Sequence, residues 1–186
     1  MLGGILIFLG VLVFLVVIWV IGSYNGVITL RNSVDNAWAQ IDVQLTRRHD
    51  LIPNLVKTAK GYLTHEKETL ENVIKARTQA TQATAVKDKQ AAENFLTSTL
   101  RSLFAVVERY PDLKANQSML KLHEEITSTE NRIAFARQFY NDETMRHNTL
   151  IQQFPVNLIA SSFNFSNKEL FEIEDTSHKE VPEVNL

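Results

Sequence analysis

The sequence predicts an all-α protein in which an N-terminal transmembrane helix is continuous with the first helix of a long antiparallel, up-down four-helix bundle. Three observations support this prediction. Residues 2–21 are all apolar or glycine. The chain that follows repeats apolar side chains every three or four positions, the period of a helix. Residues that break helices are sparse between positions 27 and 153, where they are Pro53, Gly61 and Pro111.

Residues 1–23 form the predicted membrane span. A run of about 20 apolar residues is long enough to cross a bilayer core of about 30 Å. Trp19 and Tyr24 lie near its end, where aromatic rings favour the headgroup region. The alternative is a cleaved signal peptide, which has a basic start, a shorter apolar core and a small-residue cleavage site. The chain begins Met-Leu-Gly-Gly and first carries charge at Arg31, which favours a retained span.

The charges beside the span suggest its orientation. Lysine and arginine are absent before the span, whereas Arg31 follows it, with Arg47 and Arg48 further on. The positive-inside bias therefore favours an external N-terminus and a cytoplasmic body. Cysteine is absent, so disulfides give no information about the compartment.

The bundle is predicted at residues 24–153, with helices at about 24–48, 51–85, 90–110 and 116–152. The first helix carries an apolar stripe at helical spacing: Val27, Leu30, Val34, Trp38, Ile41 and Leu45. A turn is expected at 49–53, where Asp50 can cap the second helix and Pro53 fits its first turn. The third helix ends before Pro111, because proline disfavours helix in the preceding residue.

The fourth helix has a coiled-coil-like seam that runs from Met119 to Tyr140. Polar residues interrupt the seam at 129–132. We expect Glu130 and Arg132 to be structural residues that flank the seam and form salt bridges between helices.

Short connections make neighbouring helices antiparallel, and this defines the two ends of the bundle. The turns at 47–50 and 110–116 are expected to meet at the end far from the membrane, the distal tip. Six charged residues would gather there: Arg47, Arg48, Asp50, Arg109, Asp112 and Lys114. They could cap helix ends, which is the simpler interpretation, or dock a partner. The same pairing places Trp38 opposite Gly61, which would explain a glycine within a helix.

An apolar juxtamembrane segment is predicted at 154–171, and an acidic, flexible tail at 172–186. Residues 154–165 carry no charge and include three phenylalanines. They could cap the open end of the bundle, insert into the headgroup region or pack against another subunit. The pair Gly22 and Gly26 has a spacing that lets helices approach closely, but its position favours a simple exit from the bilayer. The candidates for membrane or oligomer contacts are Trp19, Gly22, Tyr24, Gly26, Phe154, Pro155, Leu158, Ile159, Phe163 and Phe165.

The residue patterns give no support for catalytic, cofactor or metal chemistry. The five histidines form neither a His-Glu-x-x-His nor a Glu-x-x-His motif. Gly-rich phosphate loops and nucleophile elbows are also missing from the sequence. The net charge of −2 lacks the basic footprint of a nucleic-acid-binding protein. We therefore predict a protein that is not an enzyme and has no cofactor.

The amino-acid sequence resembles that of the LemA family over about residues 1–171. The stretches that carry the resemblance are Ala37-Trp38-x-Gln40-Ile41-Asp42, Arg47-Arg48-x-Asp50-Leu51-Ile52-Pro53-Asn54-Leu55, Lys60-Gly61-Tyr62, Tyr110-Pro111-Asp112-Leu113-Lys114, Thr129-Glu130-Asn131-Arg132 and Phe154-Pro155-x-Asn157-Leu158-Ile159-Ala160. One departure is Phe163-Asn164-Phe165, where the family usually has Phe-Gly-Phe. It leaves open whether the backbone at residue 164 requires glycine.

The resemblance implies a bacterial single-span protein with its N-terminus outside and a helical bundle in the cytoplasm. It also implies no established enzymatic activity, and a kinship with proteins that help to form magnetosome membranes. The leading hypothesis is a non-enzymatic scaffold that binds the lipid bilayer, self-associates through the transmembrane helix and bundle, and organises or remodels the bacterial inner membrane. The alternative is a membrane-tethered adaptor whose distal tip docks a membrane or cytoplasmic protein, such as a protease or signalling protein.

Overall fold

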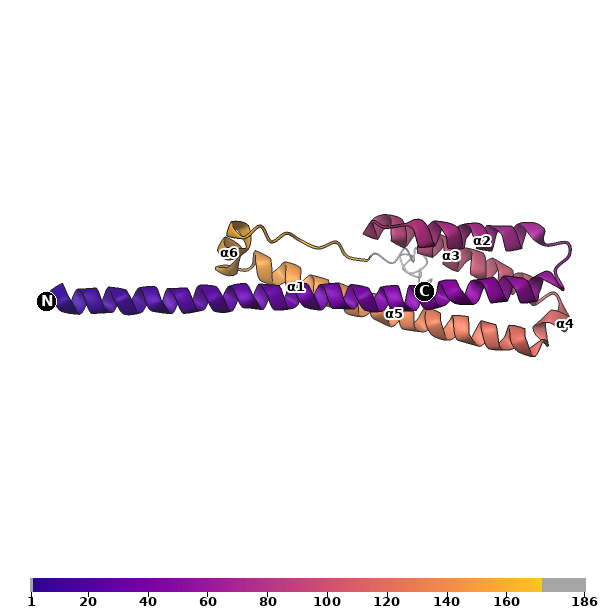
Figure 1. Ribbon diagram of the computed structural model, residues 1–186, viewed down its shortest axis with the longest axis horizontal. Coiled ribbons are helices and arrows are strands. Elements are labelled where there is room, and N and C mark those ends of the chain that lie inside the picture. The colour runs from indigo at the N-terminus through magenta and orange to yellow at the C-terminus, as the bar shows by residue number, and fades with distance from the viewer. Residues whose placement is uncertain (1, 172–186) are drawn as a thin grey trace, which may run out of the picture. The chain divides into compact units, whose positions relative to one another are not determined.

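The computed structural model describes residues 2–171, and the predicted tail at 172–186 lies outside them. This part of the chain is helical and contains no strand, so the all-α prediction is confirmed. The six helices (Figure 1) are α1 (Leu2–Lys60), α2 (Lys67–Gln82), α3 (Val86–Val107), α4 (Pro111–Lys114), α5 (Gln117–Gln152) and α6 (Val156–Ser162).

Contacts divide the described chain into two compact units. The first unit comprises residues 2–42 and 135–170, and the second comprises 43–134 and 171. Helices α1 and α5 contribute residues to both units.

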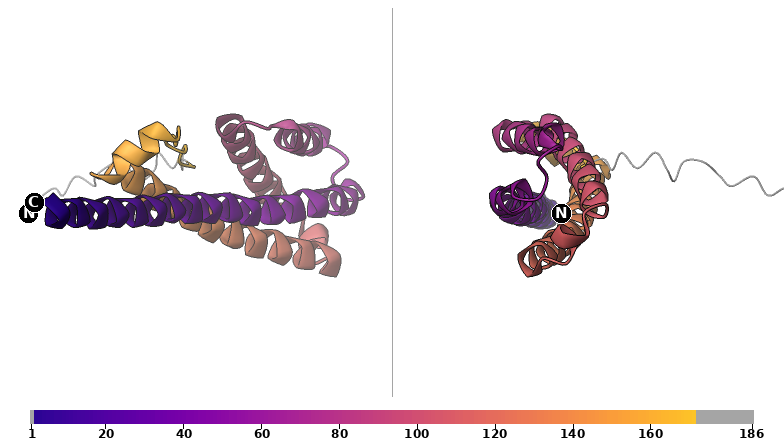
Figure 2. Two further views of the ribbon diagram at one scale, coloured as in Figure 1. Left: turned by 60° about the vertical axis from the view of Figure 1, so that its left-hand side comes forward. Right: turned by 90° about the vertical axis from the view of Figure 1, so that its right-hand side faces the viewer.

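The first unit contains the apolar start of α1, the C-terminal part of α5 and α6. The apolar window of α1 is long enough to span a membrane, and none of it is buried. The stripe of α1 becomes buried from Val27 onward, through Val34, Ala37 and Ile41. Trp38, on the same helix, contacts Tyr140 of α5, with ring centroids 5.3 Å apart. Figure 2 shows α6 turned back beside α1.

The second unit has one core to which the end of α1, all of α2 and α3, and the start of α5 contribute. α2 and α3 lie side by side and run in opposite directions (Figures 1 and 2). The buried apolar residues come from each of these helices and from α4; examples are Ile52, Leu55 and Ala59 of α1, Leu70, Val73 and Ala76 of α2, Leu96, Leu100 and Leu103 of α3, Leu113 of α4, and Met119 and Ile126 of α5.

The turn predicted at 49–53 is wrong, because α1 continues through Pro53 to Lys60. The apolar stripe shows why: Leu45, Ile52, Leu55 and Ala59 are buried at helical spacing on both sides of the proline. The chain turns instead at residues 61–66, so that the predicted helix at 51–85 is divided between α1 and α2.

The expected pairing of Trp38 with Gly61 is wrong for the same reason. Trp38 lies within α1 and Gly61 directly follows it, so the two residues cannot face each other across antiparallel helices. A Cβ atom added at Gly61 would lie 3.9 Å from the carbonyl oxygen of Thr58, an ordinary contact. Gly61 is the first residue after α1 and does not have a positive φ, so neither packing nor backbone conformation requires glycine there.

The other helix ends lie near the predicted ones. α3 begins at Val86, and the predicted end near Tyr110 becomes a short break followed by α4, which has Pro111 as its first residue. α5 begins at Gln117 because Asn116 caps it: the Asn116 Oδ1 accepts hydrogen bonds from the backbone N–H groups of Ser118 at 2.9 Å and Met119 at 3.2 Å.

Candidate functional site

α6 is held against α1 at the point where the apolar run ends. Val27 of α1, Ile151 of α5 and Ala160 of α6 are buried in one small cluster. Phe165 packs against this cluster. The ring of Tyr24 contacts Phe165 with a centroid distance of 5.7 Å and Phe163 with one of 4.9 Å. Phe163 and Phe165, two of the candidates for membrane or oligomer contacts, therefore lie against a third candidate, Tyr24.

The end of α6 has the geometry of a Schellman motif. Asn164 has a φ of 57°, in the left-handed region. The N–H of Phe165 donates to the Ala160 carbonyl at 2.9 Å, and the N–H of Asn164 donates to the Ser161 carbonyl at 3.4 Å. The backbone at 164 thus has the conformation that glycine favours, and asparagine is the side chain that tolerates it best. Asn164 therefore keeps the left-handed backbone conformation at the position where the family usually has the glycine of Phe-Gly-Phe.

The outer side of this segment exposes large apolar groups. Phe154 is 80% exposed, Leu158 58% and Phe163 54%. Residues 148–167 carry no charged side chain, so the exposed surface of this segment combines these apolar groups with uncharged polar ones, such as Gln153, Ser161 and Ser162. Ile159, which was predicted to contact membrane or another subunit, is instead buried within the protein.

The other predicted contact residues lie on α1 and at the start of α6. Trp19 and Gly22 are exposed, whereas Gly26 and Pro155 are partly buried. A Cβ atom at Gly22 or Gly26 would have nothing within 4 Å. Neither glycine is therefore required by packing within the described chain.

An extended segment after α6 is fastened to α5. The side-chain amide of Asn148 donates to the Lys168 carbonyl at 2.9 Å, and its oxygen accepts from the Lys168 N–H at 2.8 Å. About two turns before Asn148 on α5, the Tyr140 hydroxyl donates to the Glu169 carbonyl at 2.8 Å. Burial, together with the charges of Glu169 and Asp35, raises the pKa of Tyr140 above its usual value. The Lys168 ammonium pairs with Asp35 of α1 at 3.1 Å.

The predicted distal tip does not assemble from the six expected residues. Arg47, Arg48 and Asp50 lie inside α1, about 15–20 Å before its end at Lys60. Arg47 and Asp50 are exposed and Arg48 is fully buried. The adaptor hypothesis therefore loses the surface on which it was based.

The remaining three tip residues lie at the end of the second unit, next to the turn at 61–66. Arg109 pairs with Glu66 at 3.4 Å, and Lys114 pairs with Glu108. Asp112 is exposed in α4. The Asn116 amide also donates to the Tyr62 hydroxyl at 3.1 Å. These contacts join the two loops at this end.

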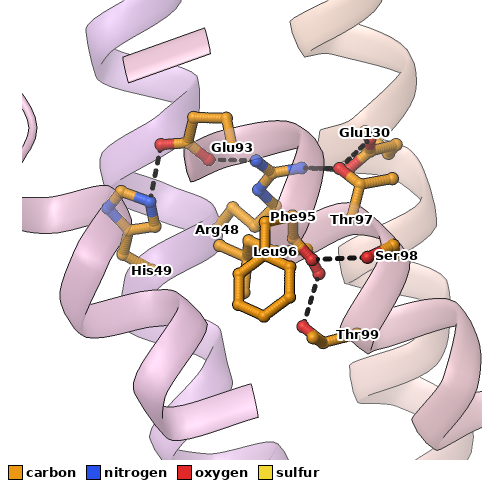
Figure 3. A network of polar contacts seen from close by, with 9 residues as sticks. All are labelled: Arg48, His49, Glu93, Phe95, Leu96, Thr97, Ser98, Thr99 and Glu130. Carbon is orange, nitrogen blue, oxygen red and sulfur yellow. Dashed lines mark hydrogen bonds and ion pairs between the residues drawn. The ribbon is translucent and has the colours of Figure 1, made fainter. Parts of the chain in front are cut away.

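Arg48 is instead the centre of a buried polar network (Figure 3). Its guanidinium forms ion pairs with Glu93 of α3 and Glu130 of α5, and donates to the Thr97 hydroxyl at 3.0 Å. Thr97 donates in turn to Glu130 at 3.1 Å. The Nε2 of His49 donates to the second oxygen of Glu93 at 2.9 Å. The salt bridge expected at Glu130 is present, whereas Arg132 is exposed on α5.

The electrostatics of the network favour a charged Glu93. Burial by itself raises the pKa of this carboxyl, but the hydrogen bond from His49, the charges of Arg48 and His49, and the hydrogen bond from Arg48 lower it by more. The net pKa lies below the usual value of 4.5. The network is therefore a set of mutually compensating charges, the arrangement that a buried charge requires.

Pro53 leaves a backbone carbonyl of α1 without its helical hydrogen-bond donor. Proline has no N–H, so the carbonyl of His49, four residues earlier, loses its helical donor. The Nε of Arg77, on α2, donates to this oxygen at 2.8 Å. An arginine from a neighbouring helix thus compensates for a proline inside α1.

The network reaches solvent at Glu130, whose side chain is 36% exposed. A groove of about 320 Å³ opens there along α3 and α5. Its wall includes the stacked rings of Phe104 and His123, whose centroids lie 4.1 Å apart. Within residues 2–171, no group of three or more metal-ligating side chains is placed to hold a metal ion.

Sequence reasoning missed several residues that matter in the structure: His49, Arg77, Glu93, Thr97 and Asn148. One available signal was the apolar stripe that continues past Pro53, which would have placed Arg48 and His49 inside a helix. The partners of Arg48 come from helices that are distant in the sequence, and helical spacing carries no information about them.

Comparison with known proteins agrees with the resemblance found in the sequence. The chain is 25% identical to Protein LemA of Metamycoplasma hominis, over 89% of this chain and 76% of that protein. It is 24% identical to Magnetosome protein MamQ 2 of Paramagnetospirillum magneticum and 21% identical to Magnetosome protein MamQ of Magnetospirillum gryphiswaldense, over 80% of this chain in each case. The chain spans 64% of the length of these two magnetosome proteins. The sequence model of the LemA family matches residues 37–186, and the chain belongs to the LemA family.

Proposed function

We propose that this protein is a non-enzymatic, membrane-anchored helical scaffold that self-associates and organises or remodels the bacterial inner membrane. The observation that carries the proposal is the start of α1, whose apolar membrane-length window is not buried by any other part of the described chain. Such a surface is stable in lipid and costly in water. The magnetosome names of the MamQ relatives support a role in membrane organisation by analogy.

The orientation in this proposal follows from the sequence. Arg31 is the first charged residue after the apolar run, so the positive-inside bias favours an external N-terminus and a cytoplasmic body. In the second unit, segments of α1, α2, α3 and α5 share one core, which supports an up-down four-helix bundle as the cytoplasmic part of the scaffold.

Self-association is supported by an aromatic pair outside the apolar run. Phe135 and Phe139 lie one turn apart on α5 and are 72% and 44% exposed. Neighbouring exposed aromatic rings are typical of protein interfaces. We propose that this pair contacts a second copy of the chain. Anchoring in one membrane holds the same surface of each copy at the same level, where the copies can meet.

The test is the mass of the full chain in detergent together with the shape of vesicles that contain it. Light scattering should give a mass of several chains, and cryo-electron microscopy should show deformed or clustered vesicles. The double variant Phe135→Gln, Phe139→Gln should lower the mass. The control is Val43→Gln, which changes an exposed apolar residue elsewhere and should leave the mass unchanged. A monomer that leaves vesicles spherical would contradict the proposal.

A further inference from the structure

We propose that α6 and its flanking residues form a second membrane contact, in which Phe154, Leu158 and Phe163 enter the headgroup region of the bilayer beside the span. The inference rests on the proposed membrane anchoring of α1, but it does not depend on self-association. The occupant of this apolar surface is lipid.

The depth of α6 follows from its contact with α1. Tyr24 lies three residues after Ile21, the last residue of the apolar run, which is about 4.5 Å along a helix. The headgroup layer on each side of a bilayer is about 5–7 Å thick. Tyr24 therefore lies within this layer when the run occupies the hydrocarbon core. Because the Phe163 ring is centred 4.9 Å from the Tyr24 ring, Phe163 lies at a similar depth.

The inner side of α6 agrees with this depth. Ala160 is buried against Val27, which lies about 9 Å beyond Ile21 by helical rise. The buried side of α6 thus faces α1 between the levels of Tyr24 and Val27. By this measure Ala160 lies at the outer edge of the headgroup layer. Phe163 lies within the layer, at the level of Tyr24.

The distribution of charge marks the same boundary. Residues before Arg31 on α1, and residues 148–167 of the segment that contains α6, have no charged side chain. The first charges beyond these stretches are Arg31 on α1, and Arg146 and Lys168 on either side of residues 148–167. Lys168 pairs with Asp35, one turn after Arg31, at 3.1 Å. The uncharged part of the first unit therefore includes both the apolar run and α6.

The experiment uses the absence of cysteine from the chain. Single cysteines are introduced into the full-length protein in lipid vesicles by the substitutions Leu158→Cys, Phe154→Cys, Met145→Cys and Ile18→Cys. Each carries a nitroxide spin label, whose accessibility to oxygen and to a water-soluble nickel complex is measured. Leu158 and Met145 are matched, because each is an apolar residue that is 58% exposed, but Met145 lies beside the charged Arg146.

Labels at 158 and 154 should show high accessibility to oxygen and low accessibility to nickel, with an oxygen-to-nickel ratio several-fold above that at 145. Two results at 158 would overturn the inference. A ratio equal to that at 145 would place α6 in water, and low accessibility to both reagents would place it against another protein chain. The label at 18 separates the two proposals. If it reports water, the membrane anchoring itself fails; if it reports lipid while 158 and 154 do not, the contact by α6 alone fails.

Discussion

Arg48 keeps its charge inside the second unit because two carboxylates and a hydroxyl surround its guanidinium. Glu93 and Glu130 pair with it, and Thr97 accepts one of its hydrogen bonds. Removing one member of a buried ion pair leaves the other charge uncompensated, which costs on the order of 3 kcal/mol. The network therefore fixes which faces of α1, α3 and α5 meet.

The Glu93 carboxyl should make stability depend on pH. Its pKa is lower in the folded protein than the usual 4.5, so the unfolded chain binds protons more readily. The stabilisation is complete above pH 4.5 and is lost as the pH falls through the lower, folded-state pKa. At neutral pH, Glu93→Gln should lower the free energy of unfolding by on the order of 3 kcal/mol.

Urea unfolding of the full chain in detergent, followed between pH 7 and pH 3, measures this effect. The difference between the parent protein and Glu93→Gln should shrink with falling pH. Glu108→Gln is the control, because Glu108 belongs to an exposed ion pair, and such pairs contribute little. A difference for Glu93→Gln that stays constant across this pH range would contradict the account.

Pro53 and Arg77 form a pair whose coupling can be measured. Arg77→Met should destabilise the protein by about 1–3 kcal/mol, because the His49 carbonyl loses its donor. In a Pro53→Ala background, the restored N–H of residue 53 can donate to that carbonyl, and Arg77→Met should cost much less. Unfolding free energies of the four proteins complete the cycle. An equal loss in both backgrounds would show that Arg77 acts in another way.

At the scale of elements, α6 depends on its C-terminal cap. Asn164 holds the left-handed conformation that lets Phe165 bond to Ala160 and pack on the cluster around Val27. Without this reversal of the chain, the segment that Asn148 fastens to α5 would lead away from it.

Substitutions at residue 164 should therefore follow backbone conformation. Asn164→Gly should be neutral, because glycine adopts a positive φ without strain. Asn164→Val should destabilise the first unit by about 1–2 kcal/mol. The measurement is the thermal unfolding midpoint by circular dichroism, together with hydrogen exchange at the Phe165 amide, which is bonded to Ala160. Equal midpoints for the glycine and valine variants would contradict the assigned cap.

The helical content and the apolar stripes could be predicted from the sequence because both follow from local spacing. The stripe through Val27, Val34 and Ile41 is buried as that spacing requires. The end of α1 could not be predicted in the same way. Local rules treat Pro53 as the start of a helix, whereas in the structure a donor from Arg77 allows the helix to continue. This contact joins residues that are 28 positions apart in the chain.

The candidate site was predicted in part for a similar reason. The uncharged aromatic segment at 154–165 is visible in the sequence, and antiparallel pairing of the helices predicts its place near the membrane. Its contact with Tyr24 is known only from the structure. The partition of that segment into an inner side with Ile159 and Ala160 and an outer side with Phe154 and Leu158 depends on the chain reversal at Asn164. The grouping of Arg48 with Arg109 failed because it was derived from a turn that does not exist.

At the scale of the whole molecule, we propose a scaffold that is anchored by the start of α1, contacts lipid again through α6, and meets other copies through Phe135 and Phe139. Each of these surfaces is apolar and exposed in the described chain. Exposed aromatic and aliphatic groups of this extent are costly in water and mark sites of interaction. Self-association in the membrane is the central claim.

Subunit counting in lipid vesicles tests this claim most directly. The full chain carries one fluorophore at Lys121→Cys, an exposed position on α5, and photobleaching steps are counted at decreasing protein-to-lipid ratios. The account predicts spots with several steps that persist on dilution, and a shift to single steps for Phe135→Gln, Phe139→Gln. Single steps for the parent protein at every ratio would contradict it.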